Sequence, residues 1–160
     1  IIYTSVTILC YQCGIKLGNG NQPAIVCAEG TQIWYQNGFL HRDLDQPEII
    51  CPNGKMMWYK YDLPHRVGDL TAIIDTRGRM GWWVNGYRHR GGGNPAICIF
   101  EKDSIRQEWW VNGQLDREGG QPAIIELTKP NTVRQEWWTK GSLQRVNIGC
   151  PQFSPTTNSQ

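Results

Sequence analysis

The chain has 160 residues and a formal net charge of +2. Acidic and basic side chains are interspersed along it, so the sequence has no basic stripe of the kind that binds nucleic acid, and we expect no nucleic-acid partner. The apolar stretch at residues 1–9 is too short to cross a bilayer, and the sequence predicts no transmembrane segment.

A short motif, an aromatic pair followed by a turn, recurs along the sequence. It reads Trp-Trp-Val-Asn-Gly at residues 82–86 and 109–113, and Trp-Tyr-Gln-Asn-Gly at residues 34–38. Weaker copies begin at residues 58 and 137, and a degraded copy begins at residue 10. Successive copies therefore start 24, 24, 24, 27 and 28 residues apart. A nearly fixed period in this range is typical of a repeat array, and it predicts one array instead of two domains.

Each copy contains two runs that are typical of β-strands, and no window shows a convincing helical period. The first run carries the aromatic pair and ends at the turn, and the return run leads to a Pro-Ala-Ile segment and a second turn. An Asn-Gly turn is the strongest short-range signal for a hairpin, because both central residues need positive φ. The pattern predicts an all-β fold, an elongated antiparallel sheet of six consecutive β-hairpin repeats. The turn residues behind this prediction are Asn37, Gly38, Asn85, Gly86, Asn112 and Gly113.

The array divides the chain into three parts. Residues 10–149 hold the six repeats. Residues 1–9 include a β-branched run and are expected to form an N-terminal capping strand. Residues 150–160 are polar and contain proline, so we expect a flexible C-terminal tail.

The two-residue loop at 112–113 also predicts which residues face each other across the hairpin. Trp110 then faces Leu115, and Glu108 faces Arg117. We therefore expect exposed charge pairs, and an imidazole ring packed on the tryptophan opposite it. The same count gives the other pairs, Trp109 with Asp116, Glu136 with Arg145, Trp34 with His41, Trp58 with His65, and Trp82 with His89.

The three histidines, His41, His65 and His89, occupy one position of the repeat. Successive copies hold this position roughly 10 Å apart. A zinc–nitrogen bond is only about 2 Å long, so two of these histidines cannot share a metal. No serine, cysteine or carboxylate recurs beside them as a nucleophile or a base. We therefore expect no active site, no metal and no cofactor, and we assign the histidines a structural role.

The position after the histidine carries a recurring arginine. A regular row of guanidinium groups suits either the binding of a polyanion or packing over aromatic rings. Acidic neighbours such as Asp43, Asp69 and Glu118 favour packing. The arginines of this row are Arg42, Arg66, Arg90, Arg117 and Arg145.

The six cysteines raise the question of disulfides. Cys27 and Cys51 occupy the same repeat position, roughly 10 Å apart, whereas a bridge needs Cα atoms within about 7 Å. Cys10 and Cys13 form a Cys-x-x-Cys without a second pair at metal-site spacing. We expect free thiols in a reducing compartment.

The two residues of each aromatic pair point to opposite faces, because successive side chains on a strand alternate. We expect the first-position row to be buried between neighbouring repeats and the second-position row to form a binding face. A sheet one layer thick also needs a second layer, which predicts a two-fold homodimer. The first-position residues are Trp34, Trp58, Trp82, Trp109 and Trp137. The second-position residues are Tyr35, Tyr59, Trp83, Trp110 and Trp138.

Repeats of this length with Gly-x-x-His at the turn, and an aromatic residue shortly before it, resemble MORN-type repeats. The sequence is similar to the divergent Trp-x-x-Asn-Gly-x-x-His-Arg form that is abundant in proteins of large eukaryotic DNA viruses, as at residues 37–47 and 85–95. The resemblance covers residues 10–146 and differs from the MORN pattern in having arginine where that pattern has glycine after the histidine. It implies an elongated, often dimeric scaffold without catalysis, in a virion or the host cytoplasm.

Three functions are compatible with these patterns. The first is a non-enzymatic scaffold that mediates protein–protein interaction or assembly. The alternative is a sheet that binds carbohydrate or lipid headgroups through its exposed aromatic residues; the near-neutral charge gives little support to a membrane partner. The third is a hydrolase that uses one of the histidines. The sequence favours the first.

Overall fold

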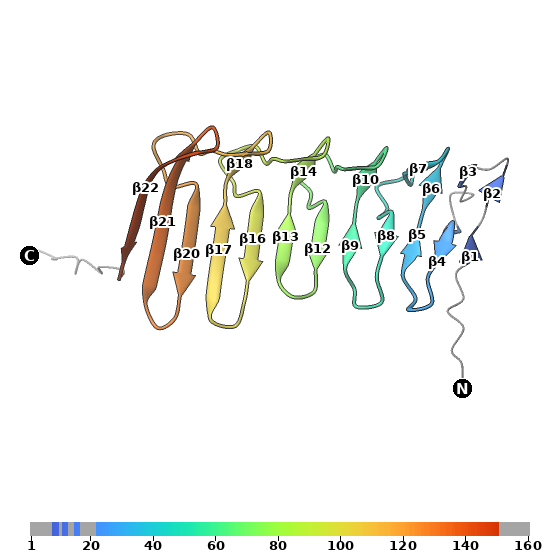
Figure 1. The fold of residues 1–160 in the computed structure, drawn as a ribbon, viewed down its shortest axis with the longest axis horizontal. Helices are drawn as coiled ribbons and strands as arrows, with labels where there is room; N and C mark the ends of the chain where they lie inside the picture. Colours follow the sequence, from blue (N-terminus) through green and yellow to red (C-terminus); the bar gives the residue numbers. More distant parts are fainter. Residues whose placement is uncertain (1–7, 10, 13–14, 17–21, 151–160) are drawn as a thin grey trace, which may run out of the picture.

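The computed structural model describes residues 8–9, 11–12, 15–16 and 22–150. These residues form 22 β-strands and no helix, and Figure 1 shows them as an elongated array of strands lying side by side. The predicted all-β sheet of consecutive hairpins is therefore confirmed. Most of the predicted capping strand (residues 1–7), most of the predicted tail (residues 151–160), and Cys10 and Cys13 lie outside the described residues.

Twelve strands form one antiparallel sheet, and each is hydrogen-bonded to the next one along the array. At the usual spacing of about 4.8 Å, twelve strands span roughly 53 Å. The N-terminal strands are β1 (Ile8–Leu9), β4 (Ile25–Val26), β5 (Gln32–Ile33), β8 (Ile49–Ile50), β9 (Met56–Met57), β12 (Ile73–Asp75) and β13 (Arg79–Gly81). The C-terminal strands are β16 (Ile97–Phe100), β17 (Ser104–Glu108), β20 (Ile124–Thr128), β21 (Thr132–Thr139) and β22 (Ser142–Gly149).

Five two-stranded ribbons lie along one long edge of this sheet, at the top of Figure 1. Each of the four later ribbons carries a second-position aromatic residue and closes on the turn that follows it, with the predicted register between Trp110 and Leu115. The Asn-Gly hairpins are therefore side ribbons, and the sheet strands themselves are joined by the second turn of the repeat, as between β8 and β9. The ribbons are β2 (Tyr11–Gln12) with β3 (Ile15–Lys16), β6 (Tyr35–Gln36) with β7 (Phe39–Leu40), β10 (Tyr59–Lys60) with β11 (Leu63–Pro64), β14 (Trp83–Val84) with β15 (Tyr87–Arg88), and β18 (Trp110–Val111) with β19 (Gln114–Leu115).

The turns of the ribbons have the left-handed backbone that the sequence predicted. Asn85 and Gly86 have φ of 49° and 82°, and the turns at 37–38 and 112–113 are equivalent. Lys140 and Gly141 adopt the same geometry, with φ of 46° and 78°, although lysine is not a turn residue. The repeat therefore imposes this turn even where the local sequence does not favour it.

Neighbouring ribbons are joined through the glycines of these turns. The amide N–H of Gly86 donates to the carbonyl of Pro64 at 2.9 Å, and that of Gly113 donates to the carbonyl of Arg88 at 3.0 Å. A Cβ on Gly113 would lie 2.8 Å from Cδ1 of Tyr87 in the preceding ribbon. The glycine is thus required by its φ and by the close approach of the preceding ribbon.

Cross-strand pairing divides the sheet into two faces. A central row runs across the whole sheet on one of them, which we call the open face, and we call the opposite side the loop face. Residues paired directly across strands share a face. The central row is Leu9, Ile25, Ile33, Ile49, Met57, Ile73, Gly81, Ile97, Glu108, Ile124, Glu136 and Val146.

The buried tryptophans and alanines form a thin seam on the loop face, while the buried members of the central row are Ile25, Gly81, Glu108, Ile124 and Glu136. First-position tryptophans pack there with the alanines of the Pro-Ala-Ile segments, as in the cluster of Trp82, Ala96 and Cys98. Trp82 is 9% exposed, which confirms its predicted burial. Within the described residues, however, no large side chain is less than 2% exposed. The array therefore has a seam at each repeat boundary instead of a central core.

The predicted charge pairs are wrong. Glu108 stays in the main sheet, where it pairs with Ile97 and Ile124, while the chain leaves the sheet at Trp109 and carries Arg117 away. In the last copy a register shift between residues 137 and 138 places Arg145 opposite Trp137, and Glu136 opposite Val146. The hairpin count holds as far as Trp109, whose carbonyl accepts the amide of Asp116 at 3.2 Å as predicted, and fails beyond it in the main sheet.

Candidate functional site

The first position of the repeat forms a stack of tryptophan and arginine. The guanidinium carbon of Arg90 lies 3.8 Å from the centroid of the Trp82 ring. A cation over an aromatic face is attracted by the ring quadrupole, more strongly when both are shielded from water. The same stack recurs in every described copy, with distances between 3.6 and 4.1 Å, for Arg42 on Trp34, Arg66 on Trp58, Arg117 on Trp109 and Arg145 on Trp137. The arginine row therefore packs over aromatic rings, as one of the two interpretations predicted.

Four of the five stacks are tied to the preceding repeat by a hydrogen bond from the indole N–H, whereas the indole nitrogen of Trp34 is buried without a partner among the described residues. The indole N–H of Trp82 donates to the carbonyl of Asp69 at 3.0 Å, and Nη1 of Arg90 donates to the carbonyl of Pro95 at 3.2 Å. The carboxylate of Asp69 also binds Arg90, whose charge lowers the pKa of this aspartate through a hydrogen bond. The stacks are thus structural joints that fix one repeat on the next.

The predicted pairing of histidine with tryptophan is confirmed for two copies, in which the amides of His65 and His89 donate to the carbonyls of Trp58 and Trp82 at 3.1 Å. The contacts of the imidazole rings differ from the prediction, because they are made with the following ribbon. Nδ1 of His65 accepts a hydrogen bond from the amide of Asn85 at 3.0 Å, and Nδ1 of His89 accepts one from Asn112 at 3.3 Å. His41 instead stacks on the Tyr61 ring, with 5.3 Å between ring centroids. Each histidine ring therefore contacts the turn of the following ribbon. The guanidinium of the arginine beside it covers the tryptophan ring.

The second-position residues are half-buried, so they are neither fully covered nor fully exposed. The guanidinium carbon of Arg88 lies 5.4 Å from the Trp83 centroid and 4.7 Å from the Trp110 centroid. The indole N–H groups of Trp110 and Trp138 donate to carboxylates of the central row, Glu108 at 2.8 Å and Glu136 at 2.9 Å. In the C-terminal repeats, polar partners therefore already occupy this row.

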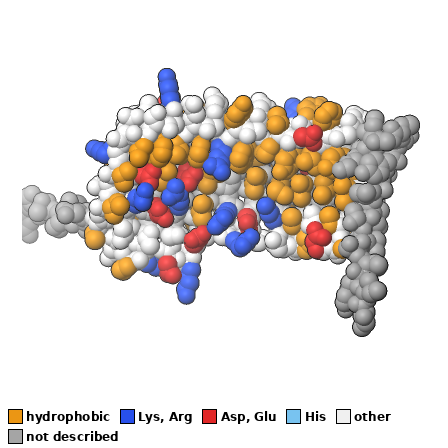
Figure 2. Space-filling model, viewed as in Figure 1, with side chains coloured by type: hydrophobic (Ala, Val, Ile, Leu, Met, Phe, Trp, Pro, Cys, Tyr) orange, Lys and Arg blue, Asp and Glu red, His pale blue; other side chains and the backbone are white. Residues whose placement is uncertain are grey.

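The N-terminal repeats differ, because their second-position residues lie beside apolar members of the central row. Tyr35 follows Ile33 by two residues and Tyr59 follows Met57 by two, so each pair shares the open face. Figure 2 shows apolar side chains gathered over the N-terminal strands and charged ones over the C-terminal strands. We call the N-terminal region the apolar half; its half-buried residues are Cys27, Ile33, Tyr35, Ile49, Cys51, Met57, Tyr59 and Ile73.

The C-terminal region, which we call the charged half, satisfies its own polar groups. Nε of Arg106 donates to Glu108 at 2.7 Å, and its Nη1 donates to Glu126 at 3.2 Å. Arg134 binds Glu136 at 2.7 Å. Both carboxylates of the central row are buried, at 9% and 6% exposure, and each holds one arginine and one indole.

One buried carboxyl was not found from the sequence. Glu48 is 2% exposed and stands where the other copies have a buried alanine. It accepts hydrogen bonds from the amides of Arg42 at 3.0 Å and Tyr59 at 2.6 Å. Burial raises the pKa of Glu48 to about 7, although these amides and the charge of Arg42 act in the opposite direction. The sequence signal that could have revealed this carboxyl is the change from Pro-Ala-Ile in other copies to Pro-Glu-Ile at residues 47–49.

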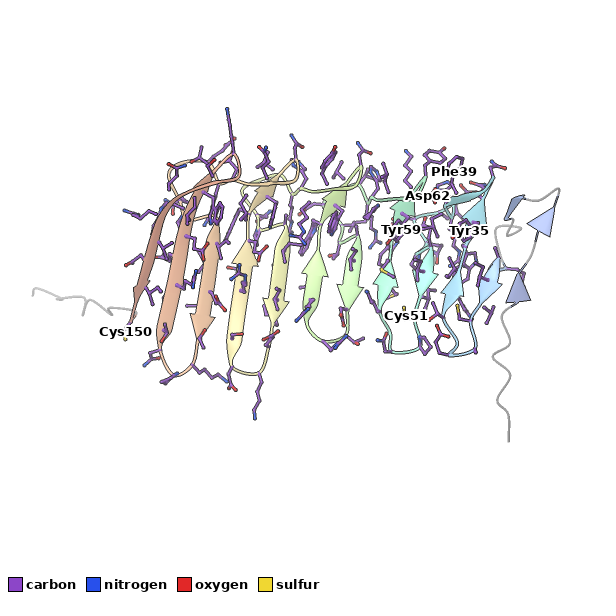
Figure 3. All side chains as sticks on the ribbon, in the orientation of Figure 1. Tyr35, Phe39, Cys51, Tyr59, Asp62 and Cys150 are labelled. Carbon is purple, nitrogen blue, oxygen red and sulfur yellow. The ribbon has the colours of Figure 1, made fainter. Side chains whose placement is uncertain are left out.

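A second feature missed from the sequence is the apolar edge formed by the ribbons. Phe39 and Tyr61 meet edge to face at 6.0 Å, and they are 46% and 57% exposed. Leu63 and Tyr87 continue this edge, at 48% and 60% exposed. Figure 3 shows Phe39 at the ribbon edge, with Tyr35 and Tyr59 lower on the array and Cys51 toward the opposite edge.

Cys27, Cys51, Cys98 and Cys150 are free, so the prediction that the first two stay unbridged is confirmed. Among the residues that the structure describes, no three metal-ligating side chains come together, and no helix is long and apolar enough to cross a membrane. Comparison with family models, curated proteins and solved structures gives no match. The function must therefore be argued from the surface of the array itself.

Proposed function

We propose that this chain is a non-enzymatic scaffold of MORN-like repeats, of the kind found in large DNA viruses, which binds another protein layer through the apolar half of its open face. One observation carries the proposal. The apolar half presents isoleucine, methionine and tyrosine side chains that remain half-exposed on a sheet one layer thick. Burial of apolar area stabilises association by roughly 25 cal/mol per Å². A second layer on this face would supply the core that each repeat lacks.

A second copy of the chain is the partner that we propose first. Contact between two identical patches around a two-fold axis is the commonest closed arrangement of soluble oligomers. The apolar half is suited to it because its members carry no like charges that would oppose each other. The charged half, whose arginines and glutamates already pair within the chain, would form the polar margin of such an interface.

Two neighbouring methionines provide a matched test. Met57 belongs to the central row of the open face, and Met56 belongs to the loop face; both are half-buried. Sedimentation equilibrium of the wild type should give twice the chain mass of 18.3 kDa. Met57→Lys should give a monomer, because it places a charge in the contact, and Met56→Lys should keep the dimer.

A monomeric wild type at all accessible concentrations would refute self-association and leave a different protein as the partner. Binding of glycans or of anionic vesicles by that monomer, lost in Met57→Lys, would favour the alternative function. The described geometry supports that alternative less well. Carbohydrate stacking needs free ring faces, whereas Arg88 already lies over the rings of Trp83 and Trp110.

A further inference from the structure

The loop after each repeated arginine has one residue with two tasks. Its carbonyl accepts the indole N–H of the next first-position tryptophan, and it has a left-handed backbone with φ between 52° and 72°. We call it the acceptor residue. It always lies three residues after the arginine, and its four described instances are Asp45, Asp69, Gly93 and Gly120.

In the first two instances the acceptor residue also supplies a carboxylate to the arginine of the next repeat. Asp45 binds Arg66, with 2.9 Å from Nε to Oδ1 and 2.8 Å from Nη2 to Oδ2. Asp69 binds Arg90 in the same two-pronged way, at 2.6 and 3.0 Å. A planar guanidinium and a carboxylate match each other in this geometry, which is the strongest form of this contact.

At Arg117 the stack is present and the carboxylate is missing. The guanidinium carbon lies 3.7 Å from the Trp109 centroid, and Nη1 donates to the carbonyl of Pro122 at 3.1 Å. The acceptor residue is Gly93, and Arg117 forms no ion pair with any carboxylate of the described chain. Burial lowers the pKa of Arg117, which no neighbouring carboxylate offsets.

The space that the carboxylate would occupy is open. A Cβ built on Gly93 meets no atom within 4 Å. The position lies in a cleft of about 370 Å³ between the loop at 91–94 and the loop at 116–121, and Arg117 and Trp109 are among its lining residues. Gly120 creates the same deletion for Arg145, but that arginine is exposed at the end of the array. Among the four stacks whose acceptor residue is described, only that at Arg117 therefore combines a missing carboxylate with a described cleft.

We propose that the cleft beside Arg117 is a carboxylate-binding site, in which one carboxylate from outside the chain takes the place that Asp45 and Asp69 fill in earlier repeats. The ligand carries a single negative charge at this point. Asp116 and Glu118 also line the cleft, and they oppose a dianion such as phosphate and a polyanion such as nucleic acid. The site lies at a stack of the loop face, so it is independent of the contact proposed for the apolar half.

The arginine side-chain N–H signals in a ¹⁵N NMR spectrum test this directly, with sodium acetate as the probe and sodium chloride as the reference. The Nε–H signal of Arg117 should move in a saturable way with acetate. The signal of Arg90 should stay in place, because Asp69 already occupies its guanidinium. Phosphate should bind at least about tenfold more weakly than acetate, since each 1.4 kcal/mol of added repulsion is one factor of ten.

Gly93→Asp supplies the missing carboxylate from within the chain. Its Arg117 signal should lie at the ligand-bound position without acetate and should no longer respond. The aspartates at 45 and 69 have φ of 52° and 59°, so this backbone accepts the residue. Gly93→Asn, which has the same shape without the charge, should not move the signal to that position. Arg145→Gln should leave the acetate response unchanged.

Two blocked tripeptides, Gly-Asp-Gly and Gly-Asn-Gly, distinguish the source of the carboxylate. Equal affinity for acetate and the aspartate peptide assigns a free small carboxylate, and tighter binding of the peptide assigns an acidic side chain of a protein. The asparagine peptide should not bind. The proposal is overturned if acetate fails to move the Arg117 signal of the folded wild type, if phosphate binds more tightly, or if Gly93→Asp still responds to acetate.

Discussion

The two halves of the open face are built from the same repeat, yet different side chains cover the sheet in each half. Strands of the apolar half are two or three residues long, and their central row is isoleucine and methionine. Strands of the charged half reach eight residues, and two members of their central row are buried glutamates held by arginine and indole groups. In the charged half the central-row carboxylates find their partners within the chain, whereas the central row of the apolar half leaves isoleucine and methionine side chains partly exposed.

This difference shows that a repeat array can change its surface without changing its fold. The joints on the loop face are the same in both halves, a tryptophan covered by an arginine and bonded to the preceding loop. What changes is the residue two positions before the second-position aromatic, from Ile33 and Met57 to Glu108 and Glu136. We infer that the joints carry stability and that the open face carries function.

The largest expected effect is at a joint in the middle of the array. Trp82→Ala removes a buried indole, its stack with Arg90 and its hydrogen bond to Asp69, and should lower the free energy of unfolding by ~3–5 kcal/mol. Trp137→Ala, at a half-exposed joint, should cost clearly less. Urea denaturation of both variants measures this. Equal losses would mean that the joints do not depend on burial.

The apolar half should also show a pH dependence that comes from Glu48. Below about pH 4.5 Glu48 is protonated in both the folded and the unfolded state. Between pH 4.5 and about 7 the folded state retains a proton that the unfolded state has released, so stability falls as the pH rises. The contribution is on the order of 3 kcal/mol and is fully lost above about pH 7.

Glu48→Ala restores the alanine of the other copies and should remove this dependence. As the pH rises from 4.5 to 8, the wild type should therefore lose unfolding free energy relative to the variant. Denaturation curves at four or five pH values measure it. A difference that stays constant over this window would contradict the assigned burial of the carboxyl.

In the charged half, the buried carboxylates should matter more than exposed ones. Glu108→Gln weakens the contacts to Arg106 and Trp110 and should cost about 2 kcal/mol, because it leaves a half-buried guanidinium with a poorer partner. Glu101→Gln breaks an exposed ion pair with Arg79 at 3.2 Å and should cost at most about 0.5 kcal/mol. Thermal unfolding of both variants measures these losses. Similar losses would contradict the expectation that buried carboxylates contribute more to stability than exposed ones.

The smallest effect expected is at the turn of the last repeat. Lys140 has φ of 46°, which costs most residues energy and asparagine less. Lys140→Asn should therefore stabilise the protein by about 0.5 kcal/mol, and Asn112→Lys should destabilise it by a similar amount. Differential scanning calorimetry can resolve the two opposite shifts. Shifts of the same sign would show that other contacts set the turn.

The sequence allowed the periodic parts of this fold to be predicted, because period and turn chemistry are local. The Asn-Gly turns, the ribbon register at Trp110 and the burial of Trp82 follow from residues close in the chain. The pairing of Glu108 with Arg117 failed because it assumes a straight hairpin, and the chain changes partners at Trp109, whose N–H bonds to Ala123 while its carbonyl accepts the amide of Asp116. That change of partner has no signature in the motif.

The candidate site was less predictable for the same reason. Both residues of each aromatic pair look alike in sequence, and their different environments come from neighbouring repeats. The arginine that covers Trp109 and the glycine that leaves Arg117 without a carboxylate are 24 residues apart, at positions 117 and 93. Their relation becomes visible only when the hydrogen bonds define equivalent positions.

The most direct measurement of the central claim is the alkylation rate of single cysteines as a function of protein concentration, read by peptide mass spectrometry. Cys51 follows Ile49 by two residues and lies in the apolar half, whereas Cys150 is exposed at the end of the array. We predict that Cys51 becomes protected as the concentration rises through the dimerisation range, while the rate at Cys150 stays constant. Unchanged reactivity of Cys51 in a sample that sediments as a dimer would place the contact elsewhere and contradict the account.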